Sequence, residues 1–180
     1  EGYLFPDTYE FYLGEDPKTA INKMLVNFDR RFDDEMRAAA QEKGYSVRDI
    51  VIIASMIEKE TDGTDQAHIA SVIYNRLTNT SAETVGLLGI DATLVYALGR
   101  PITQDDYQTA DTPYNTYKYQ GLPPGPISNP GMVAIRAAMN PDSTSDYYYV
   151  LGNDGKHHFF KTLKGQQDFI AQQQVEKRSG

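Results

Sequence analysis

The chain has 180 residues, and 40% of them are hydrophobic, which is enough for one folded domain with its own core. Its 17 basic and 25 acidic residues give a formal charge of −8, which argues against a nucleic-acid partner and against a lipid-binding face. It contains no apolar run long enough to cross a bilayer, so the chain itself is expected to be soluble. Because Glu1-Gly2-Tyr3 has neither an initiator Met nor a signal-peptide pattern, the chain is interpreted as an internal fragment.

Residues that commonly bind metals or act as nucleophiles are scarce. The chain has no Cys, which excludes disulfides and thiolate sites. Its three histidines, His68, His157 and His158, form no His-Glu-x-x-His motif, so neither a metal nor a cofactor is expected. The unusual feature is 13 Tyr without any Trp. Tyr-rich surfaces often bind sugars or peptides, because the ring stacks while the hydroxyl forms hydrogen bonds.

Capping signals and apolar spacing predict the elements of the first third of the chain. The first 14 residues are aromatic and alternating, which predicts an extended segment closed by Gly14. Asp16-Pro17 predicts the start of a helix, and a second helix is expected from an Asp33 cap to about Gly44. Apolar residues at helical spacing predict one core-facing stripe after Pro17, formed by Ile21, Met24, Leu25, Phe28 and Phe32.

A buried central helix is the strongest prediction. Ser46 with Asp49 resembles a capping box, and residues 51–57 behind it carry no charge on any face. A buried strand is the competing interpretation of this run, but the cap favours a helix that continues into Glu58-Lys59-Glu60-Thr61.

The rest of the chain predicts short helices, one long loop and a hairpin. The expected elements are a helix over 67–77, a helix over 92–98 capped by Asp91, a capping signature at Thr103 and Asp106, a Pro/Gly/Tyr loop over 111–131, a helix from Asn129-Pro130 to about Met139, hairpin strands at 147–151 and 157–160, and a polar helix over 165–177. The predicted fold class is α+β, dominated by helices and with a small β-hairpin.

The first candidate for chemistry is the acid pair Glu58 and Glu60. Two residues apart on a helix, they point about 200° apart, so they cannot form a close carboxylate pair. A carboxyl at the end of an apolar helix is desolvated, which raises its pKa and keeps it protonated, as a general acid requires. The alternative is that both lie on an exposed helix end.

Other candidates lie in the loop and on two helices. Tyr114-Asn115-Thr116-Tyr117 opens a segment stiffened by Pro and is able to bind a sugar, but a structural cover or a polyproline ligand remains an equal alternative. Asn75-Arg76 is able to bind substrate, although structural pairing with a carboxylate is favoured. Asp91 is interpreted first as a helix cap.

Several blocks in this order resemble the endolytic murein transglycosylases, the MltG/YceG-like family. The matching blocks are EGYLFPDTY at 1–9, ASMIEKET at 54–61, YNRL at 74–77, DATLVYALG at 91–99, YNTY at 114–117 and GLPPGPI at 121–127, followed by the segment 147–160. Residues 88–90 depart from the family pattern and 79–89 look divergent, so no role is assigned to them.

The resemblance implies a single lysozyme-like catalytic domain over 1–180 that cleaves the β-1,4 bond between N-acetylmuramic acid and N-acetylglucosamine inside glycan strands. One Glu acts first as acid and then as base, leaving 1,6-anhydro ends, with no cofactor. The resemblance also implies a membrane anchor and a LysM-like segment upstream of Glu1. It places the protein on the extracytoplasmic face of the bacterial membrane, with peptidoglycan synthases and division or elongation proteins as possible partners.

The resemblance also assigns roles. Lysozyme-like transglycosylases commonly have Ser after the catalytic Glu, so Glu60-Thr61 indicates Glu60, with Glu58 and Arg76 as supporting residues. Substrate-binding roles are expected for Asn75, Asp91, Tyr114, Asn115, Thr116 and Tyr117. A lysozyme-type muramidase or a non-catalytic glycan-binding module are the alternatives.

Overall fold

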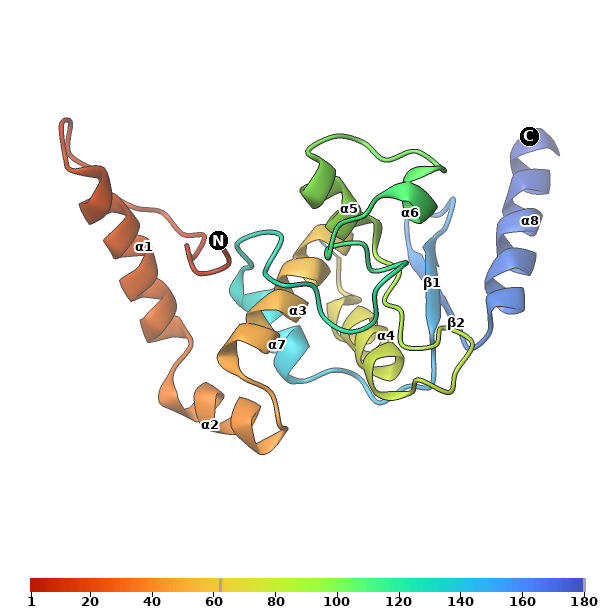
Figure 1. The fold of residues 1–180 in the computed structure, drawn as a ribbon, viewed down its shortest axis with the longest axis horizontal. Helices are drawn as coiled ribbons and strands as arrows, with labels where there is room; N and C mark the ends of the chain where they lie inside the picture. The colour runs from red at the N-terminus through yellow and green to blue at the C-terminus, as the bar shows by residue number, and fades with distance from the viewer. Residues whose placement is uncertain (62, 180) are drawn as a thin grey trace.

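The computed structural model describes residues 1–61 and 63–179. Helix α3 (Val47–Glu60) runs through the middle of the molecule (Figure 1), and every residue from Ile50 to Ile57 is buried. The capping box is present, since the Ser46 hydroxyl accepts from the Asp49 N–H while the Asp49 carboxylate accepts from the Ser46 N–H. The buried run is therefore a helix, as its cap predicts, and the strand interpretation is wrong.

Four helices pack around α3 and complete the core. They are α2 (Asp34–Glu42), α4 (Gln66–Thr78), α5 (Asp91–Leu98) and α7 (Met132–Met139). Ile69 and Ile73 of α4 and Ile135 of α7 are buried in the same apolar cluster as α3. Since this cluster surrounds α3 on several sides, the helix carries its last residue, Glu60, to a fixed position.

A hairpin and a last helix cover the other end of the molecule. Strands β1 (Tyr148–Leu151) and β2 (His157–Phe160) are antiparallel, with Tyr149 opposite Phe159. Helix α8 (Leu163–Ser179) contacts both strands and lies at the opposite end from α1 (Pro17–Arg31) in Figure 1. With the one-turn helix α6 (Asp106–Thr109), these elements confirm a helix-dominated α+β fold with a small two-stranded sheet.

The apolar stripe of α1 is only partly core-facing, which corrects the sequence expectation. Phe28 is buried, as is Phe32 just after the helix, but Ile21 and Leu25 are 47% and 40% exposed. Figure 1 shows the cause, because the first half of α1 extends away from the body of the molecule.

Two predicted helix starts are also shifted, in each case because the expected capping residue has other partners. The Asn129 side-chain oxygen accepts from the N–H groups of Gly2 (2.7 Å) and Leu4 (3.1 Å), so Asn129 holds the N-terminal arm and α7 begins at Met132. Asp91 is the first residue of α5 rather than its cap, and its carboxylate accepts from tyrosine hydroxyls instead of a helix N–H.

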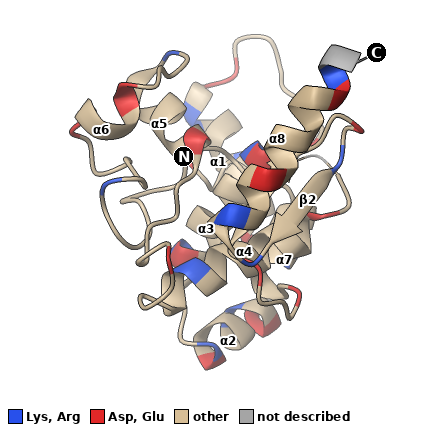
Figure 2. Ribbon diagram, turned by 90° about the vertical axis from the view of Figure 1, so that its right-hand side faces the viewer, with Lys and Arg blue, Asp and Glu red and all other residues tan. Residues whose placement is uncertain are grey.

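The charged residues are distributed over several elements. Figure 2, in which the ribbon is coloured by residue type, shows both acidic and basic positions on α2 and on α8. Among the described helices, none combines the length and the apolar character needed to cross a bilayer.

Candidate active site

Glu60 lies where two surface hollows meet. It is the last residue of α3, its side chain is partly buried, and it lines both hollows. The first hollow has a volume of about 430 Å³ and is lined by residues of α3, α4, α5, β1 and α8, by the segment 83–89 and by Tyr117. The second has a volume of about 640 Å³ and lies between the residues after α3 and the hairpin. Among the described residues, Glu60 is the one that both linings share.

The hydroxyl of Tyr149 contacts the Glu60 carboxyl directly. It donates a hydrogen bond of 2.7 Å to Oε2 of Glu60. Burial raises the pKa of Glu60, and the Tyr149 hydrogen bond opposes that rise. The Asp91 carboxylate raises the pKa of Glu60 further, while His157 and Arg76 lower it. Because the net effect is upward, the carboxyl is able to hold a proton at a higher pH than an exposed Glu.

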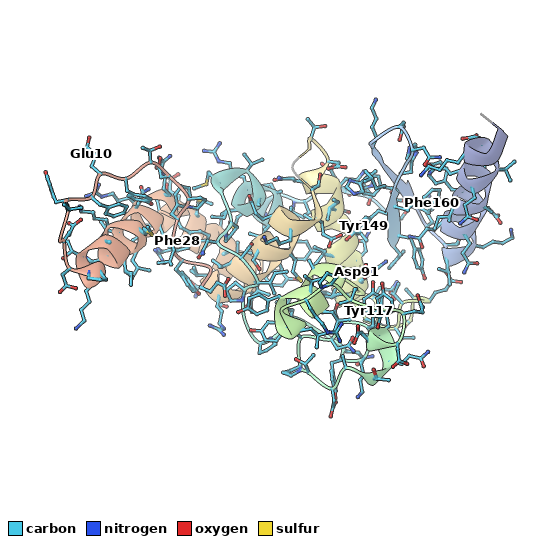
Figure 3. All side chains as sticks on the ribbon, turned by 90° about the horizontal axis from the view of Figure 1, so that it is seen from above. Glu10, Phe28, Asp91, Tyr117, Tyr149 and Phe160 are labelled. Atoms are coloured by element: carbon cyan, nitrogen blue, oxygen red, sulfur yellow. The ribbon has the colours of Figure 1, made fainter. Side chains whose placement is uncertain are left out.

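A second carboxylate, Asp91, lines the first hollow. Tyr117 donates to its Oδ1 at 2.5 Å and Tyr107 donates to its Oδ2 at 3.2 Å. Burial and the Asp91 hydrogen bond both raise the pKa of the Tyr117 hydroxyl, so it remains a donor. Figure 3 shows Asp91, Tyr117 and Tyr149 gathered in one region, far from Glu10 and Phe28.

The second hollow is organised around Asp65. The Thr61 hydroxyl donates to Oδ1 of Asp65 at 2.8 Å, and Nδ1 of His157 lies 2.6 Å from its Oδ2. Burial raises the pKa of Asp65, but the hydrogen bonds from Thr61 and His157 outweigh it and the net pKa is lowered. An ionised Asp65 therefore fixes both the residue after Glu60 and the hairpin.

Arg76 is buried and bonds to main-chain oxygens. Its Nε donates to the Tyr147 carbonyl at 2.6 Å, its Nη1 donates to the Leu88 carbonyl, and its guanidinium lies 5.3 Å from the centre of the Tyr148 ring. In the described part of the chain it forms no ion pair with Glu58 or Glu60 within 4.0 Å. Arg76 thus ties two walls of the first hollow to α4.

Gly89 lets the side chains of Arg76 and Tyr117 pack directly against the backbone of the first hollow. Its φ is +59°, and a Cβ there would lie 3.2 Å from Nη1 of Arg76 and 3.4 Å from Cε1 of Tyr117. The glycine is therefore required by the backbone and by the packing of both side chains.

Five other predicted site residues lie outside the lining of both hollows. The Asn75 amide donates to the carbonyls of Thr144 and Asp146. Asn115 and Thr116 are buried. The Asn115 amide donates to two carbonyls at α6 and its C-terminal end, and the Thr116 hydroxyl accepts from the Ile90 N–H just before α5. Tyr114 packs on Tyr96, with ring centroids 5.1 Å apart. Glu58 points the other way from Glu60 and accepts from the Gly131 N–H at 3.1 Å.

Most of the other lining residues were not predicted from the sequence, and they include Tyr149, Glu83 and His157, the partner of Asp65. The alternation of the predicted strand places Tyr147 and Tyr149 on one face and Tyr148 on the other. It does not say which of them reaches the end of α3. Glu83 lies in the divergent segment 79–89 and had no local signal.

The described residues contain no group of three or more His, Asp or Glu arranged to hold a metal ion.

Comparison with known proteins gives consistent matches along the chain. The profile of the YceG-like family matches residues 1–172. The chain is 38% identical over 170 residues to the endolytic murein transglycosylase of Bacillus subtilis, which covers 91% of this chain and 45% of the relative. It is 33% identical over 168 residues to the endolytic murein transglycosylase of Streptococcus pneumoniae serotype 2, covering 88% and 29%.

A solved structure has the same fold. The crystal structure of a yceG-like protein from Listeria monocytogenes superposes with a TM-score of 0.83 at 37% identity, over 93% of this chain and 54% of that one. The chain spans less than half the length of the curated relatives it matches.

Proposed function

The chain belongs to the YceG-like family, and on this premise we propose that residues 1–180 are a single catalytic domain with endolytic lytic transglycosylase activity. Its substrate is the glycan strand of peptidoglycan, and the bond cleaved is the β-1,4 bond between N-acetylmuramic acid and N-acetylglucosamine. The names of the Bacillus and Streptococcus relatives support the reaction class.

The position of Glu60 is the observation that carries this proposal. A carboxyl with a raised pKa, at the meeting point of two hollows, is suited to protonate the bridging oxygen of a sugar chain lying across it. As the glycosidic bond breaks, N-acetylglucosamine leaves with that proton. The Glu60 carboxylate then takes the proton of the muramyl 6-hydroxyl, whose oxygen bonds to C1 and closes the 1,6-anhydro ring. Glu60 ends protonated again, and no water is consumed.

The other residues receive supporting roles in this proposal. Asp91 and Tyr117, which line the first hollow, contact the glycan. Arg76 holds the walls of that hollow. Asn75, Tyr114, Asn115 and Thr116 act on substrate binding indirectly, because their contacts maintain the loop and the helices behind the lining. Glu58 supports the entry to α7.

Asp91 supplies an argument for the muramidase alternative. A second carboxylate in the first hollow is what a hydrolase would use to activate water or to attack the sugar. However, each oxygen of Asp91 already accepts a hydrogen bond, one from Tyr117 and one from Tyr107, which favours a carboxylate held in place over one that attacks the sugar or activates water. The products distinguish the two, since a hydrolysed end is heavier than an anhydro end by one water.

We propose that the whole protein acts outside the cytoplasmic membrane, where its substrate lies. A membrane anchor and a LysM-like segment upstream of Glu1, and contacts with peptidoglycan synthases and with division or elongation proteins, belong to the same proposal.

The test is digestion of purified sacculi followed by mass spectrometry of the released fragments. Wild-type chain is expected to give anhydro-ended muropeptides, and Glu60→Gln is expected to reduce their yield by roughly 10²–10⁴-fold, the usual contribution of a general acid–base. Glu58→Gln is the matched control and should retain activity. Activity that survives Glu60→Gln but is lost in Glu58→Gln would reverse the assignment. Binding of the wild-type chain to sacculi without any product would indicate a glycan-binding module.

A further inference from the structure

We infer, on the basis of the proposed function, that Tyr149 is a positioning residue whose hydroxyl holds Oε2 of Glu60 so that Oε1 carries the reacting proton. The relevant contact is the 2.7 Å hydrogen bond from Tyr149 to Oε2. It joins the end of α3 to a strand that lies 89 residues later in the chain.

The Tyr149 side chain is well fixed. The main-chain carbonyl of Tyr149 accepts a 2.7 Å hydrogen bond from Nε2 of Gln166, which ties β1 to α8 at this residue. Its ring meets the ring of His157 edge to face, with centroids 5.7 Å apart and planes at 85°. Because the backbone and the ring are both held, the hydroxyl is presented to Glu60 in one place.

A series of contacts links Tyr149 back to the C-terminal end of α3. The Tyr149 ring packs on His157, His157 pairs with Asp65, and Asp65 accepts from the hydroxyl of Thr61. Glu60 and Thr61 are adjacent, so both residues at the end of α3 are held from outside the helix. A Glu in the last turn would otherwise sample several rotamers.

The hydrogen bond also decides which oxygen is free. Burial and the Glu60 carboxylate raise the pKa of the Tyr149 hydroxyl well above its usual value, so Tyr149 stays a donor. Oε2 accepts this hydrogen bond whether Glu60 is ionised or protonated, and in the protonated carboxyl the carbonyl oxygen is a better acceptor than the hydroxyl oxygen. The proton of Glu60 is therefore directed to Oε1, and Tyr149 need not move when Glu60 changes from acid to base.

Several charged or titratable groups face Glu60, and among the described residues Tyr149 is the one that hydrogen-bonds to its carboxyl. Asp91 of α5, Arg76 of α4, His157 of β2 and Tyr117 act on it through space. Glu83, Asp65 and Lys156 line the two hollows. Removing the Tyr149 hydroxyl leaves all of these groups in place, so the effect of Tyr149 is separable from theirs.

Tyr149→Phe removes the hydroxyl and keeps the ring. We expect the pKa of Glu60 to rise, because the hydrogen bond opposes the effect of burial. We expect kcat to fall roughly ten- to hundredfold through loss of orientation, with KM nearly unchanged. The alkaline limb of the activity profile should move to higher pH, because a Glu60 of higher pKa stays protonated longer.

Tyr147→Phe is the matched control, since Tyr147 lies two residues earlier and its hydroxyl accepts from Asn79 instead. The pKa of Glu60 is read by NMR titration of an isotope-labelled Glu carboxyl, with Glu60→Gln identifying the signal. An unchanged pKa of Glu60 and an unchanged pH profile in folded Tyr149→Phe would overturn the inference. Since the titration needs no substrate, it is independent of the proposed function, which fails instead if wild-type chain gives no anhydro product.

A second measurement needs no change at Tyr149. The ring signal of Tyr149 in wild-type chain should shift over the pH range in which Glu60 titrates, and Glu60→Gln should abolish that step. A Tyr149 signal that does not respond to the ionisation of Glu60 would refute the contact.

Discussion

Asp91 and Glu60 share a hollow but differ in what surrounds them. Both oxygens of Asp91 accept from tyrosine hydroxyls and the residue is exposed, whereas Glu60 has one such donor and is partly buried. Desolvation and hydrogen bonding act on a carboxyl in opposite directions. At the scale of the residue, we therefore propose that Glu60 transfers the proton and that Asp91, besides contacting the glycan, raises the pKa of Glu60.

Asp91→Asn tests this division of roles. The substitution removes a negative charge that raises the pKa of Glu60, so that pKa should fall and the alkaline limb of activity should move to lower pH. The measurement is the rate of anhydro-product release as a function of pH. Asp105→Asn removes the same charge from an exposed position outside both hollows and should leave the profile unchanged. Complete inactivity of folded Asp91→Asn at every pH would favour Asp91 as a second catalytic carboxylate.

At the scale of the element, α3 has two functions, since it presents Glu60 and anchors the Pro-rich loop. The buried Ser55 hydroxyl donates to the Ile52 carbonyl at 2.7 Å and accepts from the Ile127 N–H at 3.0 Å. The Ser128 hydroxyl in turn donates to the Ser55 carbonyl at 3.0 Å. These contacts favour the interpretation of residues 121–128 as a cover fixed on α3 over that of a free polyproline ligand.

Ser55→Ala is expected to destabilise the fold by about 1–3 kcal/mol, because the buried Ile127 N–H loses its acceptor. Urea unfolding followed by circular dichroism measures this difference. Ser81→Ala, at an exposed position, is the control and should unfold at the wild-type urea concentration. The same midpoint for Ser55→Ala and the wild type would mean that this hydrogen bond does not hold the loop.

At the scale of the whole molecule, local features were predictable and distant contacts were not. The Ser46 cap and the apolar run behind it are contiguous, so the sequence alone predicted α3. The choice of Glu60 over Glu58 rested instead on the family resemblance, and it stays a prediction. Tyr149 was missed because its partner lies 89 residues away. Asn115 was expected to bind substrate because amides suit sugars, but its amide donates to the carbonyls of Tyr107 and Ala110, at α6 and its C-terminal end. A residue type indicates what a side chain is able to bond to, whereas the fold determines the partner it meets.

We propose that the chain breaks a glycosidic bond of peptidoglycan without using water. Digestion of sacculi in heavy-oxygen water tests it most directly, since a hydrolase must place solvent oxygen on the new muramyl end. We expect new ends that carry no heavy oxygen and have the anhydro mass, and none of them should be formed by Glu60→Gln. Wild-type products whose new muramyl ends carry heavy oxygen would contradict it and identify a muramidase.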